Sequence, residues 1–301
     1  MGDAVGTAIT RDCGAIPTQW PAPAKLNLFL HITGRRTDGY HTLQTIFQFL
    51  DFGDRLQFAV RDDGVIECRG GPAGVAPQDD LTVRAARLLK DHTGSPAGAT
   101  ISIEKRVPTG AGLGGGSSDA ATTLLALNHL WNTHLPRAEL EQLGSRLGAD
   151  VPVFVRGHAA WAEGIGDVLT PVDPPESWYT VIVPPVHVPT AAIYSDPDLT
   201  RHSVPIKIRA FLTGQTRNDM ESVVRRRFPE VDQAFKFLGE FGSPRMTGSG
   251  SCVFLAVATA AIGDDILRNV PEGFSGFVAR GMNWHPLYSI CGDGTNWGVA
   301  K

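Results

Sequence analysis

Residues Pro108 to Ala121 read PTGAGLGGGSSDAA, and this stretch decides what kind of protein the chain encodes. Its glycines are followed by Ser117 and Ser118 and by a helix-like run from Asp119 to Trp131. Glycine lets the backbone adopt a positive φ and bring its N–H groups close to a ligand. The start of a helix adds unpaired N–H donors and a partial positive charge. The stretch therefore predicts an anion site, and a nucleotide phosphate is the ligand that fits it best.

The composition restricts the possible partners. A chain of 301 residues suffices for one large domain or for two of about 150 residues. The formal net charge of −4 offers no basic footprint for nucleic acid. No apolar run approaches the roughly 18 residues of a membrane helix, and the N-terminus does not read as a signal peptide. The four cysteines form no C-x-x-C pair, which suits a reducing compartment. We expect a cytoplasmic protein whose partners are small molecules, with no nucleic acid and no membrane.

Strand-like and helix-like segments are mixed without strict alternation, which predicts an α+β fold of two domains with the active site in the cleft between them. Residues 1–19 are predicted to form a flexible tail, 20–172 an N-terminal nucleotide-binding domain and 173–301 a C-terminal domain. The boundary is placed at the VDPPES segment, residues 172–177. Further predicted elements are a helix capped near Asp80, an extended segment over 151–155, strands over 100–105, 179–183, 252–257 and 276–280, and a helix over 262–269.

The first strand of the N-terminal domain is predicted from a clean alternation over Lys25 to Ile32, which reads KLNLFLHI. Side chains of a strand point alternately to its two faces. Lys25 and Asn27 should therefore share one face. The four aliphatic residues should share the other: Leu26, Leu28, Leu30 and Ile32.

Several familiar phosphate loops do not fit the glycine stretch. Gly110-x-Gly112-x-x-Gly115 formally matches the dinucleotide fingerprint, but the helix that follows leads into a second helix rather than a second strand. A Walker A loop ends in Gly-Lys-Ser/Thr, and this loop has no lysine there. The H-R-D and D-F-G strings of protein kinases do not occur. A flexible glycine linker would not require Pro108 and Leu113 at set places.

The loop instead resembles the second motif of the GHMP small-molecule kinases, P-x-G-x-G-L-G-S/G-S-S/A. Residues 23–27 (PAKLN) and 247–254 (TGSGSCVF) resemble two further segments of that family, in the same order. The resemblance covers nearly the whole chain from about Trp20. Residues 21–54 and 147–166 are similar to the members that phosphorylate the 2-hydroxyl of a cytidine diphosphate sugar alcohol in non-mevalonate isoprenoid synthesis. The resemblance implies an ATP-dependent phosphotransferase with an alcohol acceptor, with ATP as co-substrate and Mg²⁺ as cofactor.

The resemblance also implies that Lys25 and Asp150 are catalytic. A carboxylate within reach of the attacking hydroxyl can accept its proton, and such help accelerates a reaction by about 10²–10⁴. Lys25 nearby would favour the ionised carboxylate and stabilise a developing alkoxide. By the residues alone, a lysine on the polar face of a strand is usually solvated. An aspartate after Gly148-Ala149 is usually a turn residue.

The implied nucleotide site follows the glycine loop. Its predicted ATP-binding residues are Lys105, Pro108, Thr109, Gly110, Ala111, Gly112, Leu113, Gly114, Gly115, Gly116, Ser117 and Ser118. The magnesium ligand is predicted at Ser117, although the hydroxyl of either serine would serve equally well as a helix N-cap. Lys105 would reach the nucleotide from the preceding strand, and the alternative for an exposed strand lysine is solvent.

The acceptor site is predicted at Asn27, Tyr40, His41 and Tyr194. In the family the Tyr-His pair lies against the cytosine ring, and Tyr194 matches the position of a second aromatic residue. A base stacked on aromatic rings gains about 1–3 kcal/mol per stacked base. The alternative for Tyr194 is core packing. Asp80 departs from the asparagine that the family commonly has near the adenine, and it serves equally well as a helix cap.

Three rival functions remain at this level. Another GHMP kinase, acting on mevalonate, homoserine or a sugar, would not require the Gly39-Tyr40-His41 segment together with Tyr194. A non-catalytic nucleotide-binding regulator would not require intact Lys25 and Asp150. A dinucleotide oxidoreductase is disfavoured because the second strand of its binding unit is missing.

Overall fold

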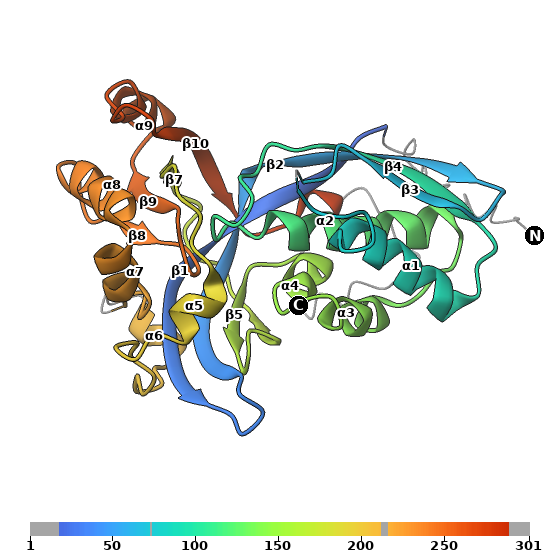
Figure 1. The fold of residues 1–301 in the computed structure, drawn as a ribbon, viewed down its shortest axis with the longest axis horizontal. Helices are drawn as coiled ribbons and strands as arrows, with labels where there is room; N and C mark the ends of the chain where they lie inside the picture. The colour runs from blue at the N-terminus through green and yellow to red at the C-terminus, as the bar shows by residue number, and fades with distance from the viewer. Residues whose placement is uncertain (1–17, 73, 212–215, 289–301) are drawn as a thin grey trace, which may run out of the picture.

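The computed structural model describes residues 18–72, 74–211 and 216–288, and within these ranges the chain forms two lobes around a pair of long strands (Figure 1). Strands β1 (Trp20–Arg35) and β2 (His41–Arg61) pair antiparallel and run through both lobes. The N-terminal lobe adds β3 (Ile66–Arg69), α1 (Leu81–Thr93), β4 (Gly98–Glu104), α2 (Gly115–Leu130), α3 (Arg137–Ser145), α4 (Val151–Arg156), β5 (Ala160–Glu163) and β6 (Val168–Pro171).

The C-terminal lobe lies at the left of Figure 1 and carries helices on one side of a short antiparallel sheet. Its elements are β7 (Trp178–Val183), α5 (Thr190–Tyr194), α6 (Ile208–Phe211), α7 (Glu221–Arg227), α8 (Pro229–Gly239), β8 (Arg245–Met246), β9 (Val253–Val257), α9 (Ala260–Leu267), β10 (Ser275–Met282) and a 3₁₀ turn at Pro286–Tyr288. The predicted mixture of helices and strands is confirmed.

Strand β10 joins the lobes into one sheet. It pairs with β7 along its length and then with β2, where Gly281 and Met282 lie opposite Leu50 and Phe49. The resulting order is β3-β4-β2-β10-β7-β9-β8, with β1 and β5 also paired to β2. Hydrogen bonds of one continuous sheet therefore fix the position of each lobe relative to the other. The division of the chain at residue 172 stays a prediction.

Three apolar cores stabilise this arrangement. One lies in the N-terminal lobe around α2 and α4, and another lies in the C-terminal lobe, where Leu30 and Ile32 of β1 join it. The third lies between them and buries Ala111 and Leu113 of the glycine loop beside Leu26 of β1. Burial of apolar surface is worth about 25 cal/mol per Å². The loop is thus anchored by its two apolar side chains at the junction of the lobes.

The segment predicted to be extended over Val151 to Val155 is a helix, α4. Its valines favour a strand locally, but Pro152 lies in the first turn, where proline is well tolerated. Gly157 then ends the helix in the left-handed region at φ 76°. A Cβ on Gly144 of α3 would lie 2.9 Å from Cγ1 of Val151, so tight helix packing decides this segment.

Helix α2 begins earlier than predicted, at Gly115 rather than near Asp119. Gly114, at φ 72°, occupies the N-cap position with no side-chain hydrogen bond. The alternative that Ser117 or Ser118 caps the helix is therefore wrong, because both residues already lie in its first turn. Asp80 does cap α1, and its Oδ1 accepts a hydrogen bond from the Thr82 N–H at 2.8 Å.

The alternation predicted along β1 breaks after Asn27. Asn27 lies opposite Phe47 but Leu30 lies opposite Thr45, so β1 carries an extra residue at this point. A β-bulge of this kind changes which face the following residues occupy. As a result Leu30 lines the same cavity as Lys25 and Asn27 instead of sharing a face with Leu26.

Two further outcomes concern the ends of the chain and the membrane. Of the predicted tail at 1–19, residues 1–17 lie outside the described residues, and two of the four cysteines, Cys13 and Cys291, do as well. Among the helices that the structure describes, none is both long and apolar enough to span a membrane.

Candidate active site

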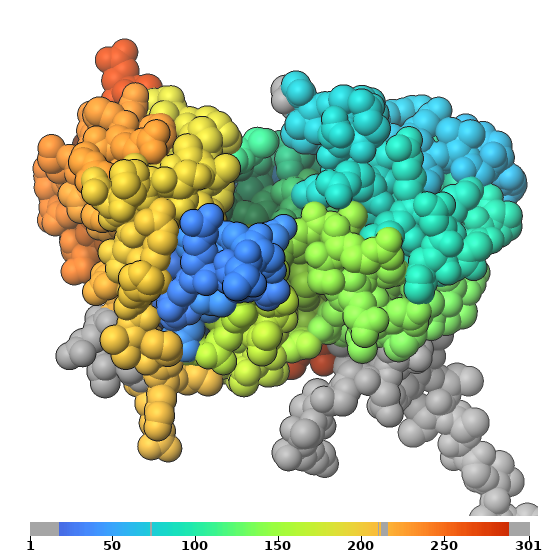
Figure 2. Space-filling view, turned by 60° about the horizontal axis from the view of Figure 1, so that its bottom comes forward, coloured from blue at the N-terminus to red at the C-terminus, as the bar shows by residue number. Residues whose placement is uncertain are grey.

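Three adjoining cavities run through the region between the lobes, where Figure 2 shows the surface hollowed between cyan-green and yellow-orange segments. The loop cavity, of about 280 Å³, lies along the glycine loop beside Lys105. The central cavity, of about 380 Å³, contains Lys25 and Asp150. The rim cavity, of about 810 Å³, lies beside Tyr40 and Tyr194.

Shared walls connect these cavities in one line. The loop and central cavities have four lining residues in common: Gly110, Gly112, Gly114 and Ser117. The central and rim cavities share another four: Ala149, Ile165, Thr190 and Tyr194. Two ligands bound at the two ends would therefore meet in the central cavity.

The glycine loop is packed closely against the residues around it. A Cβ on Gly112, which has φ 79°, would lie 2.2 Å from the carbonyl oxygen of Thr247. A Cβ on Gly114, which has φ 72°, would lie 3.0 Å from Cε of Lys25. The Thr247 hydroxyl donates to the Gly112 carbonyl at 3.0 Å and accepts from the Asn27 N–H at 3.0 Å. The second and third motifs therefore contact each other directly across the first strand.

Lys25 and Asp150 face each other in the central cavity. The Lys25 side chain is only 3% exposed, and its Nζ lies 3.3 Å from Oδ2 of Asp150. Nζ also donates to Oδ1 of Asn27 at 2.6 Å and to the Gly112 carbonyl at 3.1 Å. Asp150 remains 33% exposed and precedes α4 without capping it. The lysine is thus fixed by three oxygen atoms, while the carboxylate keeps access to the cavity.

Asn27 contacts Lys25 rather than standing free beside it. Its Oδ1 accepts from Lys25, and its Nδ2 donates to the hydroxyl of Thr45 at 3.0 Å. Both ends of the amide are therefore engaged within the protein, although the residue lines the central cavity. This geometry orients the Lys25 ammonium group; the predicted contact of Asn27 with substrate stays a prediction.

The two loop serines point in different directions. Ser117 lines both the loop cavity and the central cavity. Ser118 is fully buried, and its Oγ has no hydrogen-bond partner among the described residues. Successive residues of a helix lie 100° apart, which separates the two side chains. The Ser118 N–H donates to the Gly114 carbonyl at 2.9 Å, so the predicted contact of Ser118 with ATP stays a prediction.

Lys105 lies between two buried carboxylates that the sequence did not single out. Its Nζ is 2.5 Å from Oδ2 of Asp54 and 2.8 Å from Oδ2 of Asp119. Burial by itself would lower the pKa of Lys105, but the nearby carboxylates of Asp119 and Asp54 raise it above its ordinary value. Burial also raises the pKa of Asp119 to about 7, against the opposing effect of Lys105 and with a further increase from Asp54.

This ion-pair cluster stands behind the loop cavity, which Lys105 lines. Asp54 is fully buried and also accepts from the N–H groups of Arg106 and Val107. An isolated aspartate in a sequence carries no sign of such pairing, so nothing short of the fold would have identified Asp54 or Asp119.

The rim cavity is built from aromatic side chains. The rings of His41 and Tyr194 are stacked, with centroids 4.8 Å apart and 17° between their planes. Tyr40 is 63% exposed and lines the same cavity. The structure brings the three predicted residues together, but a base cannot enter between His41 and Tyr194 while they are in contact.

The rings have shifted acid–base properties. Burial, then the charges of Arg201 and Arg35, lower the pKa of His41. Burial, with a smaller effect from Asp150, raises the pKa of Tyr194 to about 12. Both rings are therefore neutral around pH 7.

Several cavity residues were not predicted. His187 approaches Gly110 so closely that a Cβ there would lie 2.5 Å from its ring. The hydroxyls of Thr190 and Ser249 lie 2.7 Å apart at the edge of the central cavity. Arg201 lines the rim cavity. Of these residues, only Ser249 lies in a glycine-rich motif of the sequence, and that motif could have identified it as a site residue.

The residues present suit magnesium rather than a metal held by protein alone. In the described ranges there is no group of three or more His, Cys, Asp or Glu side chains that could hold a metal ion. Magnesium is commonly bound by one or two protein oxygens together with substrate phosphates and water. The Ser117 hydroxyl offers such an oxygen in the central cavity.

Comparison with protein families finds two matching models. Residues 80–158 match the model described as GHMP kinases N terminal domain, and residues 204–276 match GHMP kinases C terminal. These segments contain the glycine loop with Asp150 in the first lobe and most of the second lobe.

Curated relatives match along most of the chain. A protein from Thiobacillus denitrificans named 4-diphosphocytidyl-2-C-methyl-D-erythritol kinase is 55% identical over 271 residues, which are 90% of this chain and 98% of that protein. A protein of the same name from Pseudomonas syringae pv. tomato is 57% identical over 268 residues, 89% of this chain and 95% of that protein.

Solved structures show the same likeness. A crystal structure of 4-(cytidine 5'-diphospho)-2C-methyl-D-erythritol kinase matches with a TM-score of 0.76 and 33% identity, covering 87% of this chain and 98% of that one. A mevalonate kinase structure matches with a TM-score of 0.64 at 15% identity, covering 88% of this chain and 99% of that one, which is a likeness of fold alone.

Proposed function

This chain belongs to the GHMP kinase family, and we propose that it transfers the γ-phosphoryl group of ATP to the 2-hydroxyl of 4-diphosphocytidyl-2-C-methyl-D-erythritol. The product would serve non-mevalonate isoprenoid precursor synthesis, and the enzyme would work in the cytoplasm. The observation that carries the proposal is the Lys25–Asp150 pair, which lies in the cavity between a glycine loop and an aromatic pocket. Relatives at 55–57% identity that bear this enzyme's name support the choice of acceptor.

ATP would bind with its phosphates along the glycine loop. Positive φ values at Gly110, Gly112 and Gly114 turn backbone groups toward the cavities, and the start of α2 adds unpaired N–H donors there. Ser117 would contribute an oxygen ligand to Mg²⁺ held chiefly by the phosphates. When bound, the ion supplies charge neutralisation for the transferred group. Lys105 would contact the nucleotide at the loop cavity.

In the central cavity, Asp150 would accept the proton of the acceptor hydroxyl. The hydroxyl oxygen forms its bond to the γ-phosphorus as the bond from phosphorus to the β–γ bridging oxygen breaks, and ADP leaves. Lys25, held by Asn27 and the Gly112 carbonyl, would stabilise the negative charge that develops on the attacking oxygen. Positioning and charge neutralisation supply most of the acceleration in phosphoryl transfer.

The cytidyl group would lie in the rim cavity, with its base against Tyr40 and near the stacked His41 and Tyr194 rings. A base stacked on an aromatic ring gains about 1–3 kcal/mol. The proposed domains, 20–172 and 173–301, would enclose the two substrates between them.

The test is ADP release by the purified protein with ATP and Mg²⁺, measured separately with the cytidyl methylerythritol acceptor, with mevalonate and with homoserine. We expect turnover with the cytidyl acceptor, with a kcat/KM at least about 10²-fold above that for the others. A reaction without acceptor corrects for ATP hydrolysis. Higher kcat/KM with mevalonate or homoserine would reject the acceptor while leaving a GHMP kinase.

A further inference from the structure

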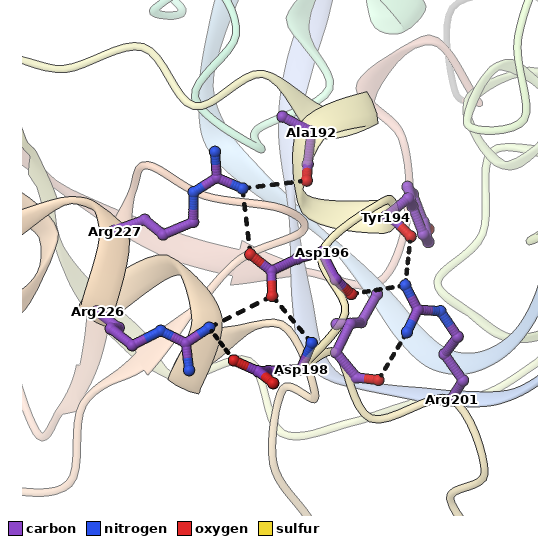
Figure 3. A network of polar contacts seen from close by, with 8 residues as sticks. Ala192, Tyr194, Asp196, Asp198, Arg201, Arg226 and Arg227 are labelled. Atoms are coloured by element: carbon purple, nitrogen blue, oxygen red, sulfur yellow. Dashed lines mark hydrogen bonds and ion pairs between the residues drawn. The ribbon is translucent and has the colours of Figure 1, made fainter.

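Arg201 contacts the acceptor pocket in a way that the catalytic scheme does not use. Its Nη2 donates to the backbone carbonyls of Tyr194 at 2.8 Å and Asp196 at 2.7 Å, and its Nη1 donates to that of Leu199 at 3.1 Å. Figure 3 shows the guanidinium group of Arg201 turned toward this loop. The N–H on Nε donates to Nε2 of His41 at 3.3 Å.

This last contact determines the protonation of His41. A guanidinium group carries only donors and stays charged throughout the working range of pH. Nε2 of His41 must therefore offer a lone pair to Arg201. The imidazole is then neutral, and its single proton resides on Nδ1.

The surroundings of His41 favour the same state. Two cationic groups, Arg201 and Arg35, oppose a positive charge on the ring, and burial, the largest effect, opposes it as well. Tyr194 stacks on the ring as a neutral phenol. Asp38 lines the same cavity, but its carboxylate is engaged by Arg36 and by the Tyr40 N–H. The pKa of His41 accordingly lies below its ordinary value.

We propose that Arg201 is a positioning residue for acceptor recognition: it fixes His41 as the Nδ1–H tautomer, so that Nδ1 donates to an acceptor atom of the bound base. Among the described residues no hydrogen bond to Nδ1 of His41 is found, which leaves this donor for a ligand. Cytosine presents a ring nitrogen and a carbonyl oxygen as adjacent acceptors, whereas uracil carries an N–H at the same ring position. The fixed tautomer thus favours cytosine. This inference rests on the proposed function for the identity of the base.

The chain offers a matched control within the same loop. Arg226 pairs with Asp196 at 3.3 Å and with Asp198 at 2.9 Å, so it supports the loop that Arg201 binds (Figure 3). It makes no contact with His41 in the described structure. Arg226→Gln loosens the loop without changing the partner of Nε2, and it separates a general effect of loop order from the specific effect on the imidazole.

The first experiment measures kinetics of Arg201→Gln and Arg226→Gln against the parent protein. We expect Arg201→Gln to raise KM for the cytidyl acceptor about tenfold, as for the loss of one ligand hydrogen bond. KM for ATP should stay unchanged, and kcat should stay within about threefold. In the parent, kcat/KM for the acceptor should not fall between pH 8 and pH 6. In Arg201→Gln the deficit in kcat/KM relative to the parent should shrink as pH falls from 8 to 6, because the imidazolium form of His41 carries a proton on Nδ1 whichever neutral tautomer it replaces.

The second experiment records ¹⁵N chemical shifts of the histidine side chains in the full-length protein, with His41 assigned from a His41→Asn sample. We expect Nδ1 to be protonated and Nε2 unprotonated in the parent, and a mixture of tautomers in Arg201→Gln. A parent spectrum with the proton on Nε2 overturns the proposal, even if Arg201→Gln does not fold. An equal rise of KM in both arginine variants, with unchanged pH profiles, also overturns it. Because the spectrum requires no substrate, a wrong acceptor assignment would not affect this result.

Discussion

The loop cavity and the rim cavity, at the two ends of the site, have walls of different kinds: one is formed by backbone and the other by side chains. At the loop end, the backbone itself forms the wall, and a Cβ on Gly112 would lie 2.2 Å from the Thr247 carbonyl oxygen. At the rim end, side chains form the wall, and Tyr40 is 63% exposed. The difference follows from the ligands. Phosphates are recognised by backbone N–H groups whatever the nucleotide, whereas a particular base requires particular side chains.

This contrast has consequences for mutation. A change at the loop end should alter folding and catalysis together, because the loop is packed into the core between the lobes. A change at the rim should alter acceptor affinity alone. A change in Lys25 or Asp150, in the central cavity, should slow the chemical step and leave ligand binding at the loop end and at the rim end unchanged.

The largest effect on activity is expected in the central cavity. Asp150→Asn should lower kcat by about 10²-fold or more, because an amide cannot accept the proton of the acceptor hydroxyl. The amide oxygen can still accept from Lys25, so the KM values for both substrates and the melting temperature should change little. Steady-state ADP release with the cytidyl acceptor measures this. A near-normal kcat would leave Asp150 with a structural role.

The next effect tests the loop end. Gly112→Ala should lower both Tm and kcat/KM for ATP, the latter by at least about tenfold, because its Cβ would lie 2.2 Å from the Thr247 carbonyl at a φ of 79°. Gly239→Ala is the control. Its Cβ would meet no atom of the described residues within 4 Å, and it lies in α8, away from the cavities, where alanine is favoured over glycine by about 0.5–1 kcal/mol. Thermal unfolding and ATP kinetics measure both variants. Equal behaviour of the two would remove the argument from close packing.

The rim end should respond in affinity without loss of stability. Tyr40→Ala should raise KM for the cytidyl acceptor by about five- to 150-fold, the equivalent of 1–3 kcal/mol of stacking. The exposed position of Tyr40 predicts an unchanged Tm, and KM for ATP should also be unchanged. Tyr40→Phe should retain the parent KM. An unaltered KM in Tyr40→Ala would reject stacking on this ring.

The smallest effect concerns the buried carboxylate behind the loop. Burial raises the pKa of Asp119 to about 7 in the folded protein, above its value in the unfolded chain. The folded state therefore holds the proton more tightly, and this contribution to stability is lost as pH rises from about 4 through 7. Asn at position 119 does not titrate, so Asp119→Asn does not lose this stability as pH rises. The difference in Tm, variant minus parent, should therefore be about 2–4 °C larger at pH 8 than at pH 5.

Thermal unfolding at the two pH values measures the Asp119 effect. The exposed Asp62, changed to Asn, is the control and should show no such dependence. A Tm difference between Asp119→Asn and the parent that is constant with pH would show that Asp119 is ionised throughout. That outcome would also mean that the loop end tolerates a second buried charge beside Asp54.

What the sequence determined by itself was the local chemistry. The glycine loop was identifiable because glycine spacing expresses a requirement of the backbone within a few positions, whereas Lys25 and Asp150 were predicted to be catalytic only through the resemblance to the GHMP kinases. Helix α1 with its Asp80 cap and most of the predicted strands followed from the same local rules. The valine-rich segment over 151–155 marks their limit, since packing against α3 made it a helix.

Only the tertiary structure decided which distant groups pair. His41 and Arg201 are 160 residues apart, and Lys105 is 51 residues from Asp54. The bulge in β1 that turns Leu30 toward Lys25 depends on the register with β2. The physical reason is common to all three: hydrogen bonds and ion pairs act over a few ångströms, and the folded chain sets those distances, while the order of residues does not.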